Sequence, residues 1–449
     1  MRRRFRWVGP TVAMLAVAAA GCGGTSVDST ATAPPPPWTS RAIPEARGEF
    51  RVAPDGKRQA IRYRGWTPRD YAAFRTYAYD DGRPVPPVGK SPMPPTSQVA
   101  GDPKEGRKLF LSRAIGPCTG CHLVPGEDDV WPAGNVGPDL STYGDRNLPN
   151  EWVFNVIYDA RIVFPNSAMP PWGTTGILKP EQIVHLVAYL QSLHGPIQPE
   201  RDPARNPFTR PKPVGFGDNL DPTNNPAVLL AECALTLWRA KGPTGKACAD
   251  CHEATPEKSM KGVATRYPKY VGAQKRVMSL EDYLTVHDPE TTGRPMPAQS
   301  GDNLTMTMLV KMQSNGMPVR VDVSSPVARA AWERGRVAFG KRVGERNHAC
   351  ADCHIADKGA NKFLGGRLLG DVTDGLTRHF PLWRTSQSQV GDMRRRMQWC
   401  MTPLGMNMLA ADAPEYAELE LYLTSFDVGK PMSVPALMCS PASSTSSAA

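Results

Sequence analysis

The sequence predicts an all-α fold in which three similar helical units follow one another, joined by extended Pro-rich linkers. Three observations lead to this prediction. The pentapeptide Cys-x-x-Cys-His occurs three times in 449 residues. A helix-like segment with an aromatic residue precedes each copy, and a segment with apolar residues at helical spacing ends each unit. The 46 prolines and 40 glycines indicate many loops between modest helices rather than one large core.

The three pentapeptides are typical of covalent haem attachment. The cysteines are Cys118, Cys121, Cys248, Cys251, Cys350 and Cys353, and the adjacent iron ligands are His122, His252 and His354. Two thiols at this spacing form thioethers to the haem vinyl groups, and the next residue offers an imidazole to the iron. Composition alone predicts about 0.004 such motifs. A redox pair or a zinc site would leave every histidine unexplained. We therefore expect three haem c groups in three cytochrome c-type domains.

The first 98 residues are expected to contain an export signal, a tether and a segment without a readable signature. Arg2 to Arg4 precede an apolar run from Val8 to Ala20, which is too short to span a membrane. Small residues lead into Cys22, as in the lipobox of bacterial lipoproteins. We expect residues 1–21 to be removed and the mature protein to be periplasmic, anchored by a lipid on Cys22. Ordinary cleavage without a lipid is the alternative.

The tether and unassigned segment span residues 22–98, and the first haem unit is expected over residues 99–197. Met169 follows His122 by 47 residues and lies in the loop Ala-Met-Pro-Pro, just before the helix that Pro180 opens. A thioether held between prolines is a usual second axial ligand in electron-transfer cytochromes, and it raises the potential. We expect Met169 to bind iron; a core methionine is the alternative.

A Pro-rich linker over residues 198–224 leads to the second unit, expected over residues 225–322. His287 follows His252 by 35 residues, at the end of an amphipathic segment. Apart from His348, which is too close to its own attachment motif, no other histidine lies between the second and third motifs. We expect His287 to be the second iron ligand of this unit; a structural or solvated histidine is the alternative.

The third unit is expected over residues 323–436, followed by a tail over residues 437–449. Cys400 follows His354 by 46 residues, and Arg396 precedes it by one helical turn. One helical face is expected to carry Val390, Met393, Met397 and Cys400. Neighbouring arginines favour the thiolate and attract an anion, so we expect a reactive thiol that binds iron. An inert buried cysteine or half of a disulfide is the alternative.

The remaining cysteines sharpen this expectation. After the six attachment thiols and Cys22 are removed, Cys233, Cys400 and Cys439 are left. One pair can close in an oxidising compartment. Because Cys400 has the basic setting of a reactive thiol, we expect the disulfide to join Cys233 and Cys439. The net charge of +10 suits an anionic partner, although a generally basic secreted protein is an equal reading, and no nucleic-acid motif is present.

At these residues the sequence resembles the SoxAX cytochromes of bacterial sulfur oxidation, with the small X subunit fused ahead of the A subunit. The X-like part is marked by Gly134 to Pro138, Met169 to Pro171 and the helix from Glu181 to Leu193. The A-like part is marked by Met260 to Pro268, Gln313 to Pro318, Arg396 to Cys400 and Pro414 to Leu423. The resemblance covers most of the chain beyond residue 98.

The resemblance implies a thiosulfotransferase that joins thiosulfate oxidatively to a cysteine of a SoxYZ-like sulfur-carrier protein and passes two electrons to a cytochrome c. It implies that Cys400 is a haem-ligating cysteine found as a persulfide, with His354 as its partner and Arg396 as a substrate-binding residue. The haem of His122 and Met169 would be the exit relay. The family usually has cysteine where His287 stands. A thiosulfate dehydrogenase that makes tetrathionate and a passive multihaem electron carrier are the alternatives.

Overall fold

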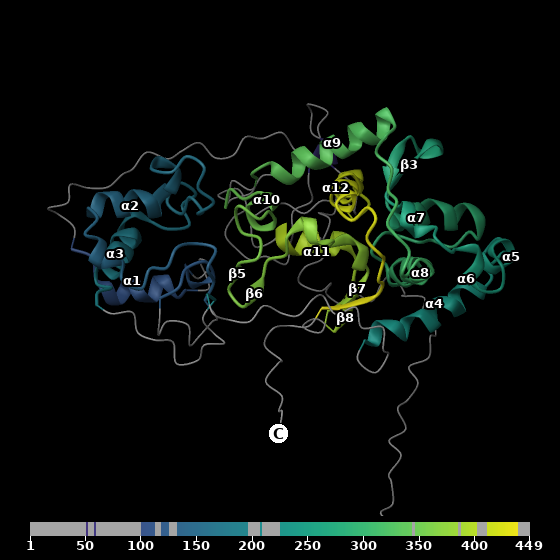
Figure 1. Cartoon of the computed structure of the whole chain (residues 1–449), viewed down its shortest axis with the longest axis horizontal. Helices are drawn as coiled ribbons and strands as arrows, with labels where there is room; N and C mark the ends of the chain where they lie inside the picture. Colours follow the sequence, from purple (N-terminus) through teal and green to yellow (C-terminus); the bar gives the residue numbers. More distant parts are fainter. Residues whose placement is uncertain are drawn as a thin grey trace, which may run out of the picture. The chain divides into compact units, whose positions relative to one another are not determined.

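The structure is a computed structural model of the whole chain. It describes residues 51–52, 58–59, 100–112, 118–124, 133–195, 207–208, 225–343, 346–384, 388–401 and 411–438. These residues are mostly helical (Figure 1). Two short strands, β1 (Arg51–Val52) and β2 (Arg58–Gln59), pair antiparallel. The expected signal peptide, the lipid site at Cys22 and most of the linker over residues 198–224 lie outside the described residues. Among the described helices, none is both long and apolar enough to cross a membrane.

The first unit is built on three helices, drawn in blue in Figure 1. They are α1 (Pro103–Phe110), α2 (Asn150–Asp159) and α3 (Pro180–Gln191). Asp102 caps α1 by accepting a hydrogen bond from the Lys104 amide at 2.8 Å, and Pro103 occupies the first turn, where its missing N–H costs nothing. The helices bury one apolar cluster that includes Phe154 and Ile183, and the first attachment motif lies in a turn beside it.

The second unit has five helices and one hairpin. They are α4 (Leu230–Arg239), α5 (Cys248–His252), α6 (Pro256–Ser259), β3 (Lys269–Val271), β4 (Arg276–Met278), α7 (Leu280–Thr291) and α8 (Gly301–Met312). The second attachment motif is α5 itself. Ser279 and Asp282 cap α7 reciprocally, with the Asp282 amide donating to the Ser279 hydroxyl at 3.1 Å and the Ser279 amide donating to the carboxylate at 3.0 Å.

The third unit adds a small sheet to its helices. Its elements are α9 (Pro326–Gly340), α10 (Cys350–His354), β5 (Phe363–Leu364), β6 (Arg367–Leu368), β7 (Leu382–Arg384), β8 (Gln389–Gly391), α11 (Met393–Met401), α12 (Pro414–Ser425) and β9 (Ala436–Met438). Strand β7 lies between β8, which is antiparallel to it, and β9, which is parallel. Because α11 follows β8 almost directly, the sheet fixes where α11 begins.

A glycine lets the first helix of a unit approach the last one closely. In the first unit α1 packs on α3, and a Cβ atom at Gly106 would lie 2.0 Å from the His185 carbonyl oxygen. In the third unit α9 packs on α12, and a Cβ atom at Gly335 would lie 2.2 Å from the Glu418 carbonyl oxygen. No side chain fits at such separations. In the second unit α4 packs on α8, and buried Ala234 takes the corresponding place.

The second and third units share one apolar core, in agreement with the short connection between them. This core contains Trp238 and Met308 from the second unit and Leu421 and Met432 from the third. The third unit also buries a cluster of its own around Phe339. Joint burial of this kind packs the two units directly against each other.

The all-α expectation is confirmed in its main part and needs two corrections. The short strands of the second and third units were not expected, because strands of two or three residues are too short to show a period in the sequence. Val390 lies in β8 rather than in the helix with Cys400, since α11 begins at Met393. Met393 and Met397 are buried, as the helical pattern predicts.

Candidate haem sites and the Cys400 centre

In the first and third units a backbone carbonyl fixes the histidine of the attachment motif. His122 Nδ1 donates to the Pro138 carbonyl oxygen at 2.8 Å, and His354 Nδ1 donates to the Gly370 carbonyl oxygen at 2.8 Å. Both carbonyls come 16 residues after the histidine. Because a carbonyl can only accept, Nδ1 carries the proton and Nε2 keeps its lone pair for a metal. The donor set of both units therefore fits a haem iron bound at Nε2.

The attachment thiols of these two units are half-buried. Burial raises their pKa, to about 11 for Cys121 and to about 12 for Cys118, Cys350 and Cys353. These thiols stay protonated at neutral pH and are poor nucleophiles before a haem is attached. In the second unit Cys251 is exposed, whereas burial raises the pKa of Cys248.

Met169 lies on the loop between α2 and α3. Its amide donates to the Ser167 hydroxyl at 3.1 Å, and its side chain packs on the same apolar cluster as Cys118. The loop therefore directs the thioether into the core that also borders the attachment motif. Ligation of iron by Met169 stays a prediction.

The structure brings His252 and His287 together in the second unit. Their ring centroids lie 6.0 Å apart, at an interplanar angle of 53°. Tyr283, one turn earlier on α7, stacks on the His287 ring with centroids 5.1 Å apart and an angle of 18°. The ring centroid of Trp238, on α4, lies 5.9 Å from that of His252, on α5. This separation leaves room for one iron between the two imidazoles, so the pair fits a haem with two histidine ligands.

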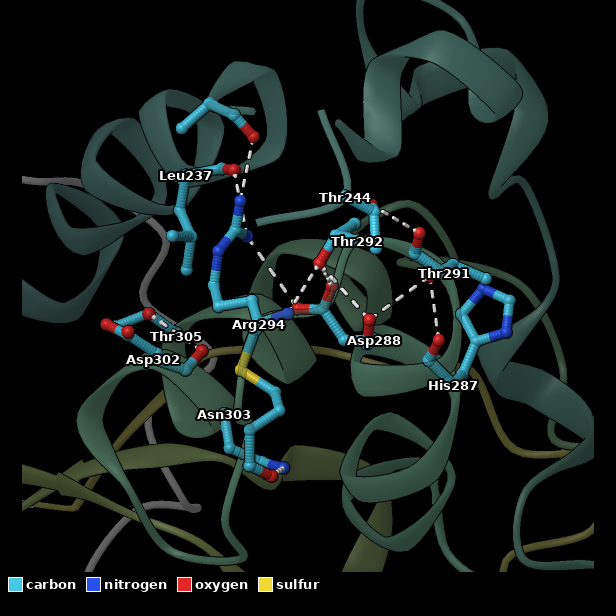
Figure 2. A network of polar contacts seen from close by, with 12 residues as sticks. Leu237, Thr244, His287, Asp288, Thr291, Thr292, Arg294, Asp302, Asn303 and Thr305 are labelled. Atoms are coloured by element: carbon cyan, nitrogen blue, oxygen red, sulfur yellow. Dashed lines mark hydrogen bonds and ion pairs between the residues drawn. The ribbon is translucent and has the colours of Figure 1, made fainter. Parts of the chain in front are cut away.

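A polar network anchors the end of α7 that carries His287 (Figure 2). Arg294 donates to the Ala240 carbonyl oxygen at 2.7 Å and lies 3.6 Å from the Asp288 carboxylate. The Thr291 hydroxyl donates to the His287 carbonyl oxygen at 2.7 Å. The network ties α7 to the end of α4 and so holds the backbone of His287 in place.

Cys400 lies near the end of α11, half-buried and without a disulfide. A hydrogen bond joins its thiol to His354. Burial alone would raise the pKa of this thiol, but the charge of Arg396, the hydrogen bond to His354 and the charge of Arg384 lower it to about 7. A large fraction is therefore thiolate at neutral pH, in contrast to the attachment thiols. The structure thus brings Cys400, His354 and Arg396 into one centre.

Two arginines of this centre escaped the sequence analysis. Arg384 on β7 and Arg367 on β6 lie over the ring of Trp399, with their Cζ atoms 4.0 Å and 4.1 Å from its centroid. Arg396 lies over the same ring at 5.2 Å. Burial, followed by repulsion from Arg396 and Arg367, lowers the pKa of Arg384 to about 9, so its guanidinium is still charged at neutral pH. No spacing in the sequence relates these two strands to Cys400.

A buried ion pair holds α11 against α7. The Arg394 guanidinium bonds to the Asp282 carboxylate and donates to the Ser279 hydroxyl at 3.0 Å, and both partners are buried. Arg394 also donates to the Ala411 carbonyl oxygen at 2.6 Å. Since Arg394 and Arg396 lie on different sides of α11, one fixes the helix while the other lies beside Cys400.

The first and third units touch at their attachment motifs. The Gly365 amide donates to the Gly120 carbonyl oxygen at 2.7 Å. The Asn135 amide donates to the Phe363 carbonyl oxygen at 3.0 Å, and the Phe363 amide returns a bond of 2.7 Å to the Asn135 side chain. Gly120 lies inside the first motif, and Phe363 follows the third motif by nine residues. The hairpin that follows the third motif is therefore hydrogen-bonded to the first motif.

The expected disulfide between Cys233 and Cys439 can be followed only at Cys233. Cys233 on α4 is disulfide-bonded, whereas Cys400 is free. Cys439, the expected partner of Cys233, lies outside the described residues.

Family models match two parts of the chain. A model described as SoxA/TsdA, cytochrome c domain, matches residues 234–319. A model described as cytochrome C oxidase, cbb3-type, subunit III, matches residues 101–190. The chain therefore contains at least two cytochrome c domains, which implies covalently bound haem c. The third motif, from Cys350 to His354, lies outside both matched ranges.

Curated relatives match nearly half of the chain. The L-cysteine S-thiosulfotransferase subunit SoxA of Rhodovulum sulfidophilum is 31% identical over 209 residues, which is 46% of this chain and 70% of the relative. The subunit of the same name from Pseudaminobacter salicylatoxidans is 30% identical over 215 residues, which is 47% of this chain and 73% of the relative. A crystal structure of SoxXA from P. pantotrophus matches with 28% identity and a TM-score of 0.44, covering 48% of this chain and 79% of that one.

Proposed function

The chain belongs to the SoxA family, and we propose that it is a haem-dependent L-cysteine S-thiosulfotransferase that joins thiosulfate to a cysteine of a SoxYZ-like carrier protein. The observation that carries this proposal is that α11 places the free thiol of Cys400 beside His354 and Arg396, where the hydrogen bond to His354 and the charge of Arg396 favour the thiolate. An electron carrier has no use for a reactive thiolate in a basic setting.

The overall reaction makes one S–S bond and releases two electrons. A carrier thiolate and a thiosulfate dianion become a cysteine S-thiosulfonate, so the total charge of the sulfur compounds rises by two units. Haem c, when bound, accepts such electrons singly and passes them on. The oxidant that finally takes them is a cytochrome c.

Cys400 is the proposed catalytic nucleophile. Its thiolate forms an S–S bond with the outer sulfur of thiosulfate as the two electrons leave. The carrier thiolate then attacks that outer sulfur, and the Cys400 thiolate is released for the next cycle. Arg396 stabilises the negative charge of the bound anion, because its guanidinium already stabilises the Cys400 thiolate.

Three haems are proposed, one for each attachment motif. His354 and Cys400 would hold the iron of the third, His252 and His287 that of the second, and His122 and Met169 that of the first. The hydrogen-bonded bridge between Gly120 and Gly365 supports electron transfer from the third unit to the first, because it brings the two motifs close together. The first haem would then reduce the external cytochrome c.

The proposed domain plan keeps the expected boundaries, except that β9 carries the last domain on to Met438. An X-like domain over residues 99–197 precedes two A-like domains over residues 225–322 and 323–438. Covalent haem attachment and a native disulfide at Cys233 are typical of an exported protein, which supports a periplasmic location. A lipid on Cys22 would be its membrane contact.

The function is tested with the purified holoprotein, thiosulfate, a reduced SoxYZ-like carrier and oxidised cytochrome c. The carrier should gain one thiosulfonate group on its arm cysteine for every two cytochromes reduced, as measured by peptide mass spectrometry and absorbance. A carrier whose arm cysteine is alkylated is the control. Tetrathionate formed from thiosulfate alone would instead indicate a thiosulfate dehydrogenase, and the absence of both products would indicate a passive carrier.

A further inference from the structure

Arg384 is a buried cation with hydrogen-bond donors that no described residue uses. Its residue is 9% exposed, and its Nε and Nη1 atoms are buried and have no hydrogen-bond partner among the described residues. Its guanidinium stacks on Trp399 instead of meeting a carboxylate. Burying a charged group with unused donors is costly, so such a group is retained where a ligand completes it.

Arg384 also lines a small pocket. The pocket is partly open to solvent, and Phe380, Arg384, Asp392, Arg395, Arg396 and Trp399 line it. Three of these side chains are guanidinium groups. Arg396 comes from the helix of Cys400 and Arg384 comes from the neighbouring sheet, so two separate elements converge on one cavity.

The one carboxylate of the pocket lining is already engaged. Asp392 accepts hydrogen bonds from the Arg395 amide at 2.7 Å and from the Gln299 side chain at 3.3 Å. Burial, followed by the charge of Glu281, raises the pKa of Asp392. The pocket as a whole therefore favours a small, doubly charged anion.

We propose that Arg384 is a substrate-binding residue, whose guanidinium binds the sulfonate oxygens of thiosulfate in this pocket while Arg396 holds the same anion beside Cys400. The proposal rests on the proposed function for its substrate. A planar guanidinium fork matches two oxygens of a tetrahedral oxyanion, which a lysine ammonium does not. Stacking on Trp399 holds the fork in one orientation before the anion arrives.

The substrate role is tested on the full holoprotein with R384Q, R384K and the control R336Q. Arg336 is half-exposed on α9 and pairs with Glu333, so R336Q removes the same charge away from the pocket. In R384Q the KM for thiosulfate should rise about 10- to 100-fold, the range for losing a charge-assisted hydrogen bond, while kcat changes less. R384K should fall in between, and R336Q should behave as the native chain.

Binding of sulfate separates this proposal from the proposed function. Sulfate shares the tetrahedral oxygens of a sulfonate but has no reactive sulfur, so its dissociation constant is measured by calorimetry without turnover. The dissociation constant for sulfate should rise in R384Q by the same factor as the KM for thiosulfate. Native affinity for sulfate in R384Q would overturn the proposal. If thiosulfate is not turned over by the native chain, the sulfate titration still decides the role of Arg384. If R384Q does not incorporate haem, R384K carries the test, because it keeps the buried charge and loses the fork.

Discussion

The second and third units carry the same five residues, Cys-Ala-Asp-Cys-His, in opposite surroundings. In both, the aspartate accepts a hydrogen bond from the amide just before the motif, at 2.8 Å for Asp250 and 2.9 Å for Asp352. Asp250 is exposed, whereas Asp352 is buried and also pairs with Arg342 at 3.0 Å and Lys358 at 2.9 Å. The motif therefore sets only where a haem is attached.

The residues that face the motif differ more between the two units than the motif itself. In the second unit the facing residue is His287, stacked on Tyr283, which suits a stable pair of nitrogen ligands. In the third unit it is Cys400, close to Arg384 and Arg396. Under the proposed function, redox relay and sulfur chemistry share one attachment motif, and the distal residue with its nearby charges decides between them.

Replacing the distal residue of the third unit should have the largest effect. C400S removes the thiolate but leaves the arginines and His354, so transfer of thiosulfate to the carrier should fall at least about 10³-fold. Carrier modification is measured by mass spectrometry. Haem content should remain that of the native chain, because none of the attachment cysteines is changed. A C400S variant with native turnover would contradict the assignment of sulfur chemistry to the third unit.

Replacing the distal residue of the second unit should lower turnover far less than C400S does. H287A removes one of the two facing imidazoles, so we expect the low-spin signal of one haem to change in electron paramagnetic resonance. Turnover should fall less than about tenfold, because the sulfur chemistry is placed at Cys400. Loss of turnover as large as in C400S would show that the second haem lies on the obligatory electron path. Y283F, which keeps the stacked ring, serves as the control and should retain the native spectrum.

The sequence predicted the parts of this comparison that depend on local patterns. The three motifs, Arg396 one turn before Cys400, and the helix opened by Pro180 follow from spacing and helical period. The carbonyls at Pro138 and Gly370 were also within reach, because both come 16 residues after their histidine. A comparison of the repeats residue by residue would have revealed them.

The arginine cluster could not be predicted in the same way. Arg367 and Arg384 lie on strands of two and three residues, too short to show a period, and the chain reverses direction between them and α11. Only the folded sheet brings them to Trp399. The ion pair of Arg394 with Asp282 likewise joins residues 112 positions apart. Long-range electrostatics of this kind depends on tertiary packing, to which single-sequence patterns are blind.

The smallest predicted effect concerns the junction of the two units, where buried charges meet. Glu420 on α12 faces Glu281 and Asp282 on α7, Lys311 on α8 and Arg394 on α11. Burial, followed by the charge of Glu281, raises the pKa of Glu420 from 4.5 to about 8, although Lys311 and Arg394 oppose this. The folded chain therefore holds a proton on Glu420 that the unfolded chain has already released.

This proton makes the junction sensitive to alkaline pH. Between about pH 4.5 and 8 the folded state binds the extra proton, so stability falls as pH rises through that window. E420Q mimics the protonated form and should unfold at the same temperature as the native chain at pH 5 but at a higher one at pH 9. Each kcal/mol should appear as about 2–4 °C in Tm. E418Q, on the same helix and paired with Arg334, should bring no such gain, and an equal gain there would mean that the effect is general to α12 rather than due to the buried carboxyl group.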